Sequence, residues 1–435
     1  MKKVIIISLI LTVSLFAQEK KLSLEESLNT GLKNSKEIKI SESKVTGSKA
    51  KITEVGSQMF PKLTFGAGYT NLNITEPDDI GLNPVNPTTI KNPFYSYGLN
   101  LSIQQPIFTG FQLSSLKGAA EYNSEAVKTE LQKAMNQKAY DIHQAYWNYY
   151  KTLNTIKLIE DNLNLLKQKL HDTEQFFENG LVTKNDVLKL KVQVANMKLK
   201  LIDTKNNLDV AKALFNKTIG LPLNAETEIA TNVAIDTISH YSYDDLLTEA
   251  LNNRDEIRSL NYRIEAGKEN ITAANSGWWP QLYAVGSYYY YNVNAETFNM
   301  NSKDLQLWYL GVSLSWDLWD WGHTSSKATQ AEQEVLQARE QVKLLKEQIE
   351  LDVYNSYLRL LSEKEKINIS RLAVQSAEEN YRITEEKYNN QLATSTDLIN
   401  AQTELLDAKT KYAVSIADYE LAIVKLKMAA GRRIY

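Results

Sequence analysis

The sequence predicts a mainly α-helical protein with a smaller β-stranded portion, and three observations support this fold class. The chain carries an internal twofold repeat, in which residues 22–69 recur as residues 241–288 and later positions recur at a slightly smaller offset. Only 17 Gly and 8 Pro interrupt 435 residues, which favours long unbroken elements. Three short segments alternate apolar and polar residues with the period of two that is typical of strands, and a fourth segment of similar length is rich in Tyr.

The first residues have the features of a secretory signal peptide. Two lysines follow Met1, an apolar run extends from Val4 to Leu15, and the small residue Ala17 suits a cleavage site. The run is too short for a helix that spans a bilayer. We therefore expect residues 1–17 to be a signal peptide, the alternative being a buried N-terminal strand.

Composition excludes several classes of function. The chain has no Cys, which excludes disulfides, thiolate metal sites and thioether-linked lipids. Its formal net charge of −3 offers no basic surface, so no nucleic acid is expected as a partner. After the signal no stretch of 18 apolar residues occurs, which excludes an inner-membrane helix.

The first structural repeat is expected over residues 18–220. A capping pattern from Ser23 to Glu26 predicts a helical stretch that breaks near Asn34 and ends before Pro61. Residues 112–177 contain no Pro, so a single helix could cover them, and it would be about 95 Å long at 1.5 Å per residue. The expected elements are strands at about 62–72 and 94–105, a long helix at about 112–177, a turn at 178–183 and a helix at 184–217.

A linker is expected over residues 221–240, and the second repeat over residues 241–435. Its first strand is rich in Tyr on both faces, so the pattern does not predict which face is buried. The expected elements are an initial helix, strands at about 281–292 and 305–316, a long helix at about 323–388, a turn at 389–394 and a helix at 395–430.

The long helices carry apolar residues at coiled-coil spacing. The return helix of the first repeat has Val187, Leu190, Val194, Met197 and Leu201, which follow a 3,4 pattern. The long helix of the second repeat admits small and polar residues at the same spacing, namely Ile367, Ser370, Val374, Ala377, Tyr381, Thr384 and Tyr388. The pattern indicates long antiparallel coiled coils instead of a wide globular core.

The four strands have the length and pattern of membrane strands. About ten residues match a tilted bilayer crossing, and the second and fourth strands are apolar on one face and small or polar on the other. Four strands cannot close a barrel, and an open edge in lipid leaves backbone groups unpaired. We therefore expect several chains to share one barrel.

Aromatic residues gather where the second repeat passes between helix and strand. Such positions suit the interface between outer-membrane lipid and water, although the same residues could fill a soluble core. They are Trp278, Trp279, Trp316, Trp319 and Trp321. Because export delivers the helices to the periplasm, the loops at 73–93 and 292–304 are expected outside the cell.

Taken together, the duplicated halves, the strand exit Gln105–Gly110 and the turn Asn179–Thr183 followed by Asp186 resemble the TolC-like outer-membrane efflux proteins. The resemblance covers almost the whole chain after the signal. It implies a homotrimer whose strands form a 12-stranded barrel, continued by a periplasmic α-barrel. It also implies a periplasmic adaptor protein and an inner-membrane transporter as partners.

The resemblance also implies two groups of site residues. Gly180, Leu181 and Val182 of the first turn would dock the adaptor, as would Leu392 of the second turn, which lacks the Gly. The periplasmic gate would involve Tyr388, Asp397 and Asn400, the last at a position that is frequently acidic in relatives. The alternative role for Asp397 is to cap its helix, as Asp186 would in the first repeat.

Motifs of enzymes are missing from the sequence. The four His residues are isolated, and no metal-binding pair, phosphate loop or nucleophile elbow occurs. We expect no catalytic residues, no cofactor and no metal site.

Two functions from different classes fit these features. The first is a passive export duct of a tripartite efflux or secretion system, gated at its periplasmic tip. The alternative is a periplasm-spanning coiled-coil scaffold or adhesin of the outer membrane without a transport role. Within the duct class, small-molecule efflux and protein secretion both remain open.

Overall fold

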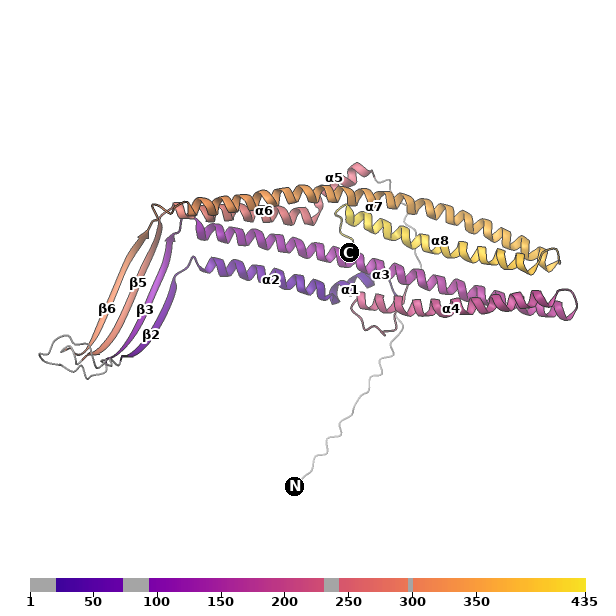
Figure 1. Ribbon diagram of the computed structural model, residues 1–435, viewed down its shortest axis with the longest axis horizontal. Helices are drawn as coiled ribbons and strands as arrows, with labels where there is room; N and C mark the ends of the chain where they lie inside the picture. Colours follow the sequence, from indigo (N-terminus) through magenta and orange to yellow (C-terminus); the bar gives the residue numbers. More distant parts are fainter. Residues whose placement is uncertain (1–20, 73–93, 231–241, 296–299) are drawn as a thin grey trace, which may run out of the picture. The chain divides into compact units, whose positions relative to one another are not determined.

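The computed structural model describes residues 21–72, 94–230, 242–295 and 300–435 (Figure 1). The expected signal peptide at 1–17 and the expected outer loop at 73–93 lie outside the described residues, as does part of the expected linker. The coarse fold class is confirmed, because the chain is mainly helical with a smaller sheet.

Eight helices and six strands make up the described part of the chain. The helices are α1 Leu24–Asn34, α2 Lys36–Ser57, α3 Gln112–Glu178, α4 Lys184–Thr218, α5 Tyr243–Asn253, α6 Asp255–Ala274, α7 His323–Asn389 and α8 Ser395–Ala429, with a 3-10 turn η1 at Asn275–Trp278. The strands are β1 Lys21–Leu22, β2 Lys62–Leu72, β3 Phe94–Phe108, β4 Glu228–Ile229, β5 Gln281–Ala295 and β6 Met300–Ser315.

The hairpin of the second repeat corrects the expected loop at 292–304. Strand β5 continues to Ala295 and β6 begins at Met300, so most of that range is strand. The reason is that the antiparallel ladder persists beyond the pair Asn292 and Asp304, whose side chains are joined by a hydrogen bond of 2.7 Å. Strand β3 likewise passes Gln105 and reaches Phe108, with a register shift where Pro106 lacks a backbone donor.

The chain folds into two compact units, and each takes segments from both repeats. Unit 1 comprises Met1–Ser41, Leu131–Ile257 and Leu345–Tyr435, and unit 2 comprises Glu42–Glu130 and Arg258–Leu344. The compact units therefore do not coincide with the sequence repeats.

Unit 2 contains an antiparallel sheet in the order β2-β3-β5-β6 (Figure 1). Strand β3 of the first repeat pairs directly with β5 of the second, which also defines the register of the tyrosine-rich strand. Strands β2 and β6 form the two edges and have no further partner in the sheet of the described residues.

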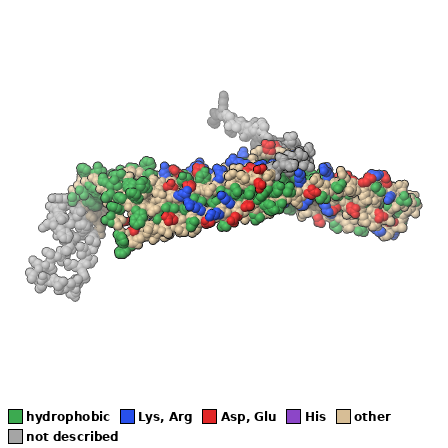
Figure 2. Space-filling model, turned by 90° about the horizontal axis from the view of Figure 1, so that it is seen from above, with side chains coloured by type: hydrophobic (Ala, Val, Ile, Leu, Met, Phe, Trp, Pro, Cys, Tyr) green, Lys and Arg blue, Asp and Glu red, His purple; other side chains and the backbone are tan. Residues whose placement is uncertain are grey.

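The register of the sheet separates its side chains into two faces, because paired residues of neighbouring strands point the same way. The apolar face carries Leu63, Phe65, Leu99, Leu101, Ile103, Tyr288, Trp308, Leu310, Val312 and Leu314. The polar face carries mostly small and hydroxyl or amide side chains, namely Thr64, Gly66, Asn100, Ser102, Gln104, Ser287, Gly311 and Ser313. Hydrophobic side chains gather over the strands and their junctions, whereas charged side chains spread over the helices (Figure 2).

Unit 1 is held together by interdigitated helix faces, with an aromatic cluster on α3 at its centre. Trp147 and Tyr150 are buried there with Phe215 of α4. The hydroxyl groups of Tyr146 and Tyr149 donate to the backbone carbonyls of Ala230 and Thr227, at 2.7 and 2.8 Å. Burial raises the pKa of both phenols to about 12, so these groups stay neutral donors.

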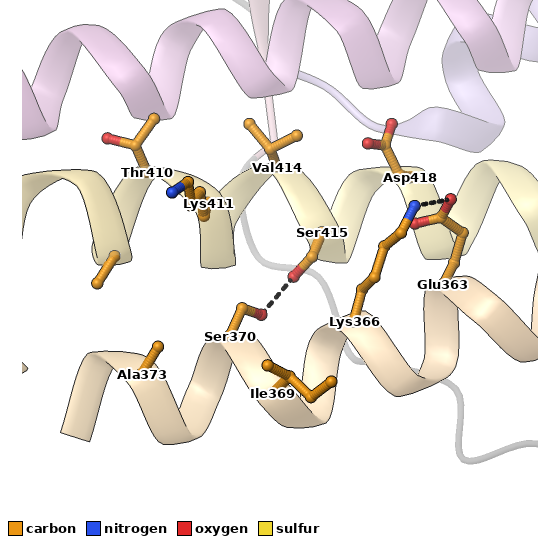
Figure 3. Close-up of a pocket in the computed structure, with 11 residues that line it drawn as sticks. Glu363, Lys366, Ile369, Ser370, Ala373, Thr410, Lys411, Val414, Ser415 and Asp418 are labelled. Carbon is orange, nitrogen blue, oxygen red and sulfur yellow. Dashed lines mark hydrogen bonds and ion pairs between the residues drawn. The ribbon is translucent and has the colours of Figure 1, made fainter. Parts of the chain in front are cut away.

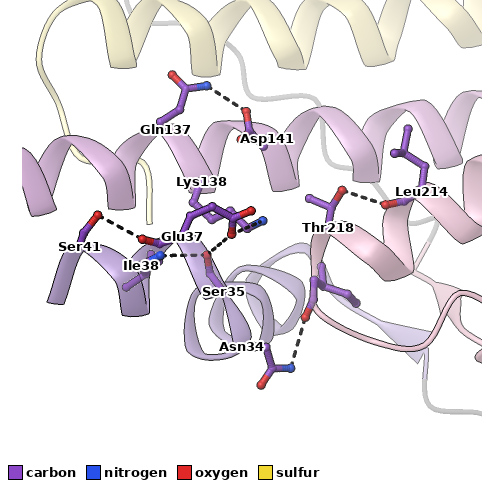
Figure 4. Close-up of polar contacts among 11 residues, drawn as sticks. Asn34, Ser35, Glu37, Ile38, Ser41, Gln137, Lys138, Asp141, Leu214 and Thr218 are labelled. Carbon is purple, nitrogen blue, oxygen red and sulfur yellow. Dashed lines mark hydrogen bonds and ion pairs between the residues drawn. The ribbon is translucent and has the colours of Figure 1, made fainter. Parts of the chain in front are cut away.

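The first helix of each repeat is interrupted by a kink, between α1 and α2 and between α5 and α6. Each kink lies beside a glycine that follows the last helix of the same repeat. Gly220 has φ +78° and Gly431 has φ +79°, values that glycine adopts without strain. The side chain of Asn34 donates to Ile219 O at 3.3 Å (Figure 4). A Cβ atom at Gly220 would lie 2.5 Å from Cβ of Asn34, so the kink requires glycine there.

Helix α2 restarts after this kink through Ser35. Its Oγ accepts from the backbone N–H of Ile38 at 3.3 Å and donates to Oε2 of Glu37 at 2.7 Å (Figure 4). The Ser35 hydrogen bond lowers the pKa of Glu37, whose carboxylate also lies 3.5 Å from Nζ of Lys138 on α3.

The segment Gly431–Tyr435 lies along α3. Asn136 clamps its backbone, since Nδ2 donates to Arg432 O at 3.0 Å and Oδ1 accepts from Ile434 N at 3.2 Å. Nε2 of His143 lies 3.3 Å from Ile434 O, and a carbonyl can only accept, so this nitrogen carries the proton. Burial lowers the pKa of His143, which keeps the ring neutral.

Candidate functional site

The turn between α3 and α4 is stabilised by its own backbone. Gly180 has φ +72°, its N–H donates to Phe177 O at 2.9 Å, and Leu181 N–H donates to Phe176 O at 2.9 Å. This pair of bonds is a Schellman-type ending, which favours glycine at the left-handed position. The turn leaves the side chain of Leu181 49% exposed, while Val182 is half-buried.

The turn between α7 and α8 has the same form without the glycine. Gln391 adopts φ +61°, its N–H donates to Tyr388 O at 2.9 Å, and Leu392 N–H donates to Lys387 O at 2.7 Å. The left-handed conformation is strained for a residue with a Cβ atom. Leu392 is 78% exposed, more than its counterpart in the first turn.

Asp397 caps helix α8. Its Oδ2 accepts from Thr394 N at 2.9 Å and from Thr394 Oγ1 at 2.7 Å, and its own N–H donates to Thr394 Oγ1 at 3.2 Å. The hydrogen bonds from Thr394 hold the pKa of this carboxyl below its ordinary value. Asp186 makes the equivalent capping box with Thr183 in the first repeat. The structure thus shows the capping role of Asp397. A further role at a gate stays a prediction for Asp397 and for the exposed Asn400.

The first turns of α4 and α8 are bonded to each other. The hydroxyl of Ser395 donates to Oδ1 of Asp186 at 2.5 Å, and Ser395 is buried. Nζ of Lys189 donates to Oγ1 of Thr396 at 2.9 Å. The Ser395 bond is the main reason that the pKa of Asp186 lies below its ordinary value. We refer to the Asp186–Ser395 bond as the turn clasp.

A second connection joins α3 to α7 and includes Tyr388. Its hydroxyl lies 2.7 Å from Oγ1 of Thr173, and both side chains are buried. The Thr173 hydroxyl already donates to Lys169 O at 2.7 Å, so Tyr388 is the donor to Thr173. Nζ of Lys169 lies 2.8 Å from Oε1 of Glu385. We refer to the Tyr388–Thr173 bond as the tyrosine clasp.

Of the expected gate residues, only Tyr388 takes part in these clasps. Thr173, Lys169, Glu385 and Ser395 were not expected from the sequence. A signal existed for two of them, since Lys169 and Thr173 lie four residues apart on one face of α3, as a polar interruption of an apolar helix face.

A groove of about 410 Å³ lies between α7 and α8 (Figure 3). Small residues line its floor, among them Ala373 and Ala408, and the hydroxyl groups of Ser370 and Ser415 meet across it at 3.0 Å. The lining also includes Ile369 and Val414, so small and polar residues alternate with larger apolar ones along this part of the α7–α8 seam.

The five expected tryptophans lie at the junctions between strands and helices of unit 2. All are exposed, between 51% and 89%, so they do not fill the core of the unit. Trp316 Nε1 donates to Trp278 O at 3.3 Å, and Trp319 meets Trp321 edge to face at 5.8 Å. Trp279 packs edge to face on Phe111 at 5.8 Å.

At each junction between a strand and a long helix, the backbone turns through two consecutive residues in the left-handed conformation. Gly110 and Phe111 have φ +60° and +66°, and Trp321 and Gly322 have φ +55° and +83°. Each pair precedes a long helix, α3 or α7. The aromatic member of each pair accepts backbone strain and holds an exposed ring at the junction.

The described residues contain neither a helix suited to crossing a membrane nor a cluster of potential metal ligands. No helix among them combines the length and the apolar character that a membrane crossing requires. Within the same residues, no three side chains of the His, Asp or Glu type are grouped so that they could hold a metal ion.

Solved outer-membrane proteins share this fold. VceC from Vibrio cholerae is 18% identical with a TM-score of 0.76, over 95% of this chain and 97% of that chain. The CmeC channel of Campylobacter jejuni is 16% identical with a TM-score of 0.76, over 94% and 85%. The open-state MtrE channel of Neisseria gonorrhoeae is 13% identical with a TM-score of 0.76, over 94% and 89%. At these identities the likeness shows the fold alone.

No curated protein matches the chain. The family model described as outer membrane efflux protein matches residues 28–220 and 246–432, which is most of the sequence. This match confirms the resemblance inferred from the duplicated halves and the turns. The chain belongs to the outer membrane efflux protein family.

Proposed function

We propose that this protein is the outer-membrane duct of a tripartite efflux or secretion system. The observation that carries the proposal is the sheet of unit 2, whose apolar face is exposed while its other face carries mostly small and polar side chains. That division fits strands between lipid and a water-filled bore. The duct is a passive conduit, and an inner-membrane transporter supplies the energy. Family membership supports the duct over the scaffold or adhesin alternative.

The unpaired edges of β2 and β6 support a shared barrel. Each exposes backbone N–H and C=O groups, which in lipid cost several kcal/mol apiece when unpaired. Pairing β6 of one copy with β2 of the next satisfies both edges. Three copies then give the 12 strands of the barrel in a homotrimer.

The tryptophans of the junctions set the depth of the barrel in the membrane. Exposed, amphipathic rings next to the start of β5 and the end of β6 suit the boundary between lipid and water on the periplasmic side. The helices then continue into the periplasm, and the loops at the opposite ends of the strands face the exterior.

The turns after α3 and α7 are the proposed adaptor-docking site. Gly180, Leu181 and Val182 present an apolar apex in the first turn, and Leu392 does so in the second. Exposed apolar side chains on a rigid turn suit a protein partner, because burying them on docking releases water at no cost in loop ordering.

The turn clasp and the tyrosine clasp are the proposed closing contacts of the gate. Both join the α3–α4 hairpin to the α7–α8 hairpin, and separation of the hairpins breaks them together. The small residues beside the groove between α7 and α8 leave few large contacts to oppose such a rearrangement. Asp397 and Asn400 are proposed to line the constriction near these clasps.

The proposal is tested by current measurements in planar bilayers. The purified protein is expected to require detergent for extraction and to form ion-conducting channels, and a preparation without conductance would contradict the duct. Because the chain has no Cys, the pair Asp186→Cys and Ser395→Cys adds the only thiols. Oxidation of this pair is expected to lower the current and reduction to restore it. Equal currents before and after complete cross-linking would contradict the gate.

A further inference from the structure

Three tyrosines stack in a row on the polar face of the sheet. Tyr289 and Tyr291 of β5 have ring centroids 6.0 Å apart with planes 10° from parallel. Tyr289 and Tyr309 of β6 are 6.3 Å apart with planes 21° from parallel. We call this row of Tyr309, Tyr289 and Tyr291 the tyrosine column.

The backbone aligns these rings. Tyr289 and Tyr291 are two residues apart on one strand and so point to the same face. Tyr309 lies opposite Ser287, which makes it the diagonal neighbour of Tyr289 and places it within reach of an aromatic ring. The column therefore runs obliquely across two strands.

Gly98 of β3 makes room for the end of the column. It pairs with Tyr291, and a Cβ atom at Gly98 would lie 2.7 Å from Cε1 of that ring. The ring of Tyr291 therefore packs against the backbone of Gly98. A side chain at this position would displace the ring and disturb the stack.

The column is open to solvent, and the residues that pair directly with it on the neighbouring strands are neutral. Tyr291 and Tyr309, its two ends, are 45% and 46% exposed. Among the described side chains of the polar face, Lys62 is the one charged residue, and it pairs with Gln104, six residues along β3 from Gly98. Leu307 and Leu305 of β6 lie directly opposite Tyr289 and Tyr291, so the column is flanked by apolar side chains on that strand.

The first repeat builds the same hairpin without such a column. The positions equivalent to Tyr289, Tyr291 and Tyr309 are Thr70, Leu72 and Gly98. Strands β2 and β3 still pair over their whole length. The tyrosines are therefore not needed to form a strand pair of this kind, and their stack is a separate feature of the second repeat.

We propose that the tyrosine column is a binding site for neutral, planar aromatic solutes that pass through the bore. The inference rests on the proposed function, because only in a shared barrel does the polar face line a bore. A flat ring adds to the stack at an exposed end with its face against Tyr291 or Tyr309, as offset aromatic pairs do. Stacking of this kind on one aromatic side chain changes affinity about tenfold or more.

Current recordings from the full-length protein in planar bilayers test this site. Caffeine, a neutral planar ring system, is added on the side of the strand loops, and glucose serves as the non-aromatic solute. Caffeine is expected to produce brief current blocks that glucose does not produce. Tyr289→Leu, in the centre of the column, is expected to shorten the blocks about tenfold, and Tyr289→Phe is expected to leave them unchanged.

Matched variants separate stacking from general damage. Tyr288→Leu removes a tyrosine of the same strand from the apolar face and is expected to leave the blocks unchanged. Gly98→Ala retains every ring but displaces Tyr291, and is expected to shorten the blocks. The unblocked current of each variant shows that its channel is assembled.

The outcomes distinguish the site from the duct. A wild-type protein that carries no current overturns the proposed function and the column with it. A conducting channel in which Tyr289→Leu gives the same blocks as wild type overturns the column alone. The same follows if glucose blocks as caffeine does, or if Tyr288→Leu shortens the blocks equally.

Discussion

The hydroxyl of Tyr388 donates a 2.7 Å hydrogen bond to Oγ1 of Thr173 and so joins two helices that belong to different repeats. Both side chains are buried, and burial raises the pKa of the phenol, so the donor remains protonated at any physiological pH. A neutral, shielded bond of this kind holds its strength when salt or moderate pH changes weaken exposed ion pairs.

Replacing Tyr388 by Phe removes this bond and retains the ring. We expect the closed tip to lose about 1 kcal/mol of stabilisation in each chain, which shifts the open–closed equilibrium about fivefold per chain toward the open state. Single-channel recordings measure this change. Tyr354→Phe, at an exposed tyrosine of the same helix, is the control and should behave as wild type. An unchanged open probability in Tyr388→Phe would show that the tyrosine clasp does not restrain opening.

Asp186 makes the turn clasp sensitive to acid. Its folded pKa is depressed, chiefly by the Ser395 bond, so its stabilisation is present above the ordinary Asp pKa of about 3.9. It is lost as pH falls through the lower folded value. We expect channel current to rise below about pH 4 in wild type. Asp186→Asn should flatten this rise, and Asp203→Asn at an exposed site of α4 should retain it.

Gln391 occupies the left-handed position that Gly180 occupies in the other turn. We expect Gln391→Gly to relieve strain of about 1 kcal/mol and to slow amide exchange in residues 388–395. Gly180→Gln is the reciprocal change and should accelerate exchange in residues 177–184. If both variants exchange like wild type, the positive φ values do not limit turn stability.

His143 makes the stability of the packed segment Gly431–Tyr435 dependent on pH. Burial lowers its folded pKa below the ordinary value of about 6.5, so the unfolded chain binds a proton that the folded ring lacks. Stability is therefore full above about pH 6.5 and falls as the medium becomes more acid. Lys427, close enough to lower this pKa further, acts in the same direction.

Protease protection of this segment measures the effect. Between pH 7 and pH 5 we expect the wild-type segment to become more susceptible to cleavage. His143→Gln retains an amide donor for Ile434 O without a titrating group and should remove the dependence on pH. Asn136→Ala, which removes the backbone clamp, should be susceptible at both pH values. A wild-type segment with equal protection at both values would contradict this account.

The long helices and their caps were predictable because their signals are local. Ser23 with Glu26, Thr183 with Asp186, and Thr394 with Asp397 are three residues apart, and each pair forms a capping box. The absence of Pro from the long segments is likewise visible without knowledge of the fold.

The clasps and the extended hairpin were not predictable for the opposite reason. Thr173 and Tyr388 are 215 residues apart, and Asp186 and Ser395 are 209 apart, so one sequence holds no sign that they meet. Lys303 and Asp304 have loop-like polarity, yet their backbone continues the ladder of β6. The tyrosines of β5 alternate on both faces, and only the pairing with β3 and β6 shows which of them stack.

The direct pairing of β3 with β5 makes the two copies of the repeat dependent on each other. In the proposed barrel, a half-length chain would carry two strands with two bare edges, and six such chains would have to meet to close the ring of twelve strands. Joining the copies turns half of those encounters into intramolecular ones, with an effective concentration set by the connecting chain. Covalent duplication thereby halves the number of separate chains that must meet in the membrane. It also allows the two copies to differ in sequence, as the tyrosine column of the second copy shows.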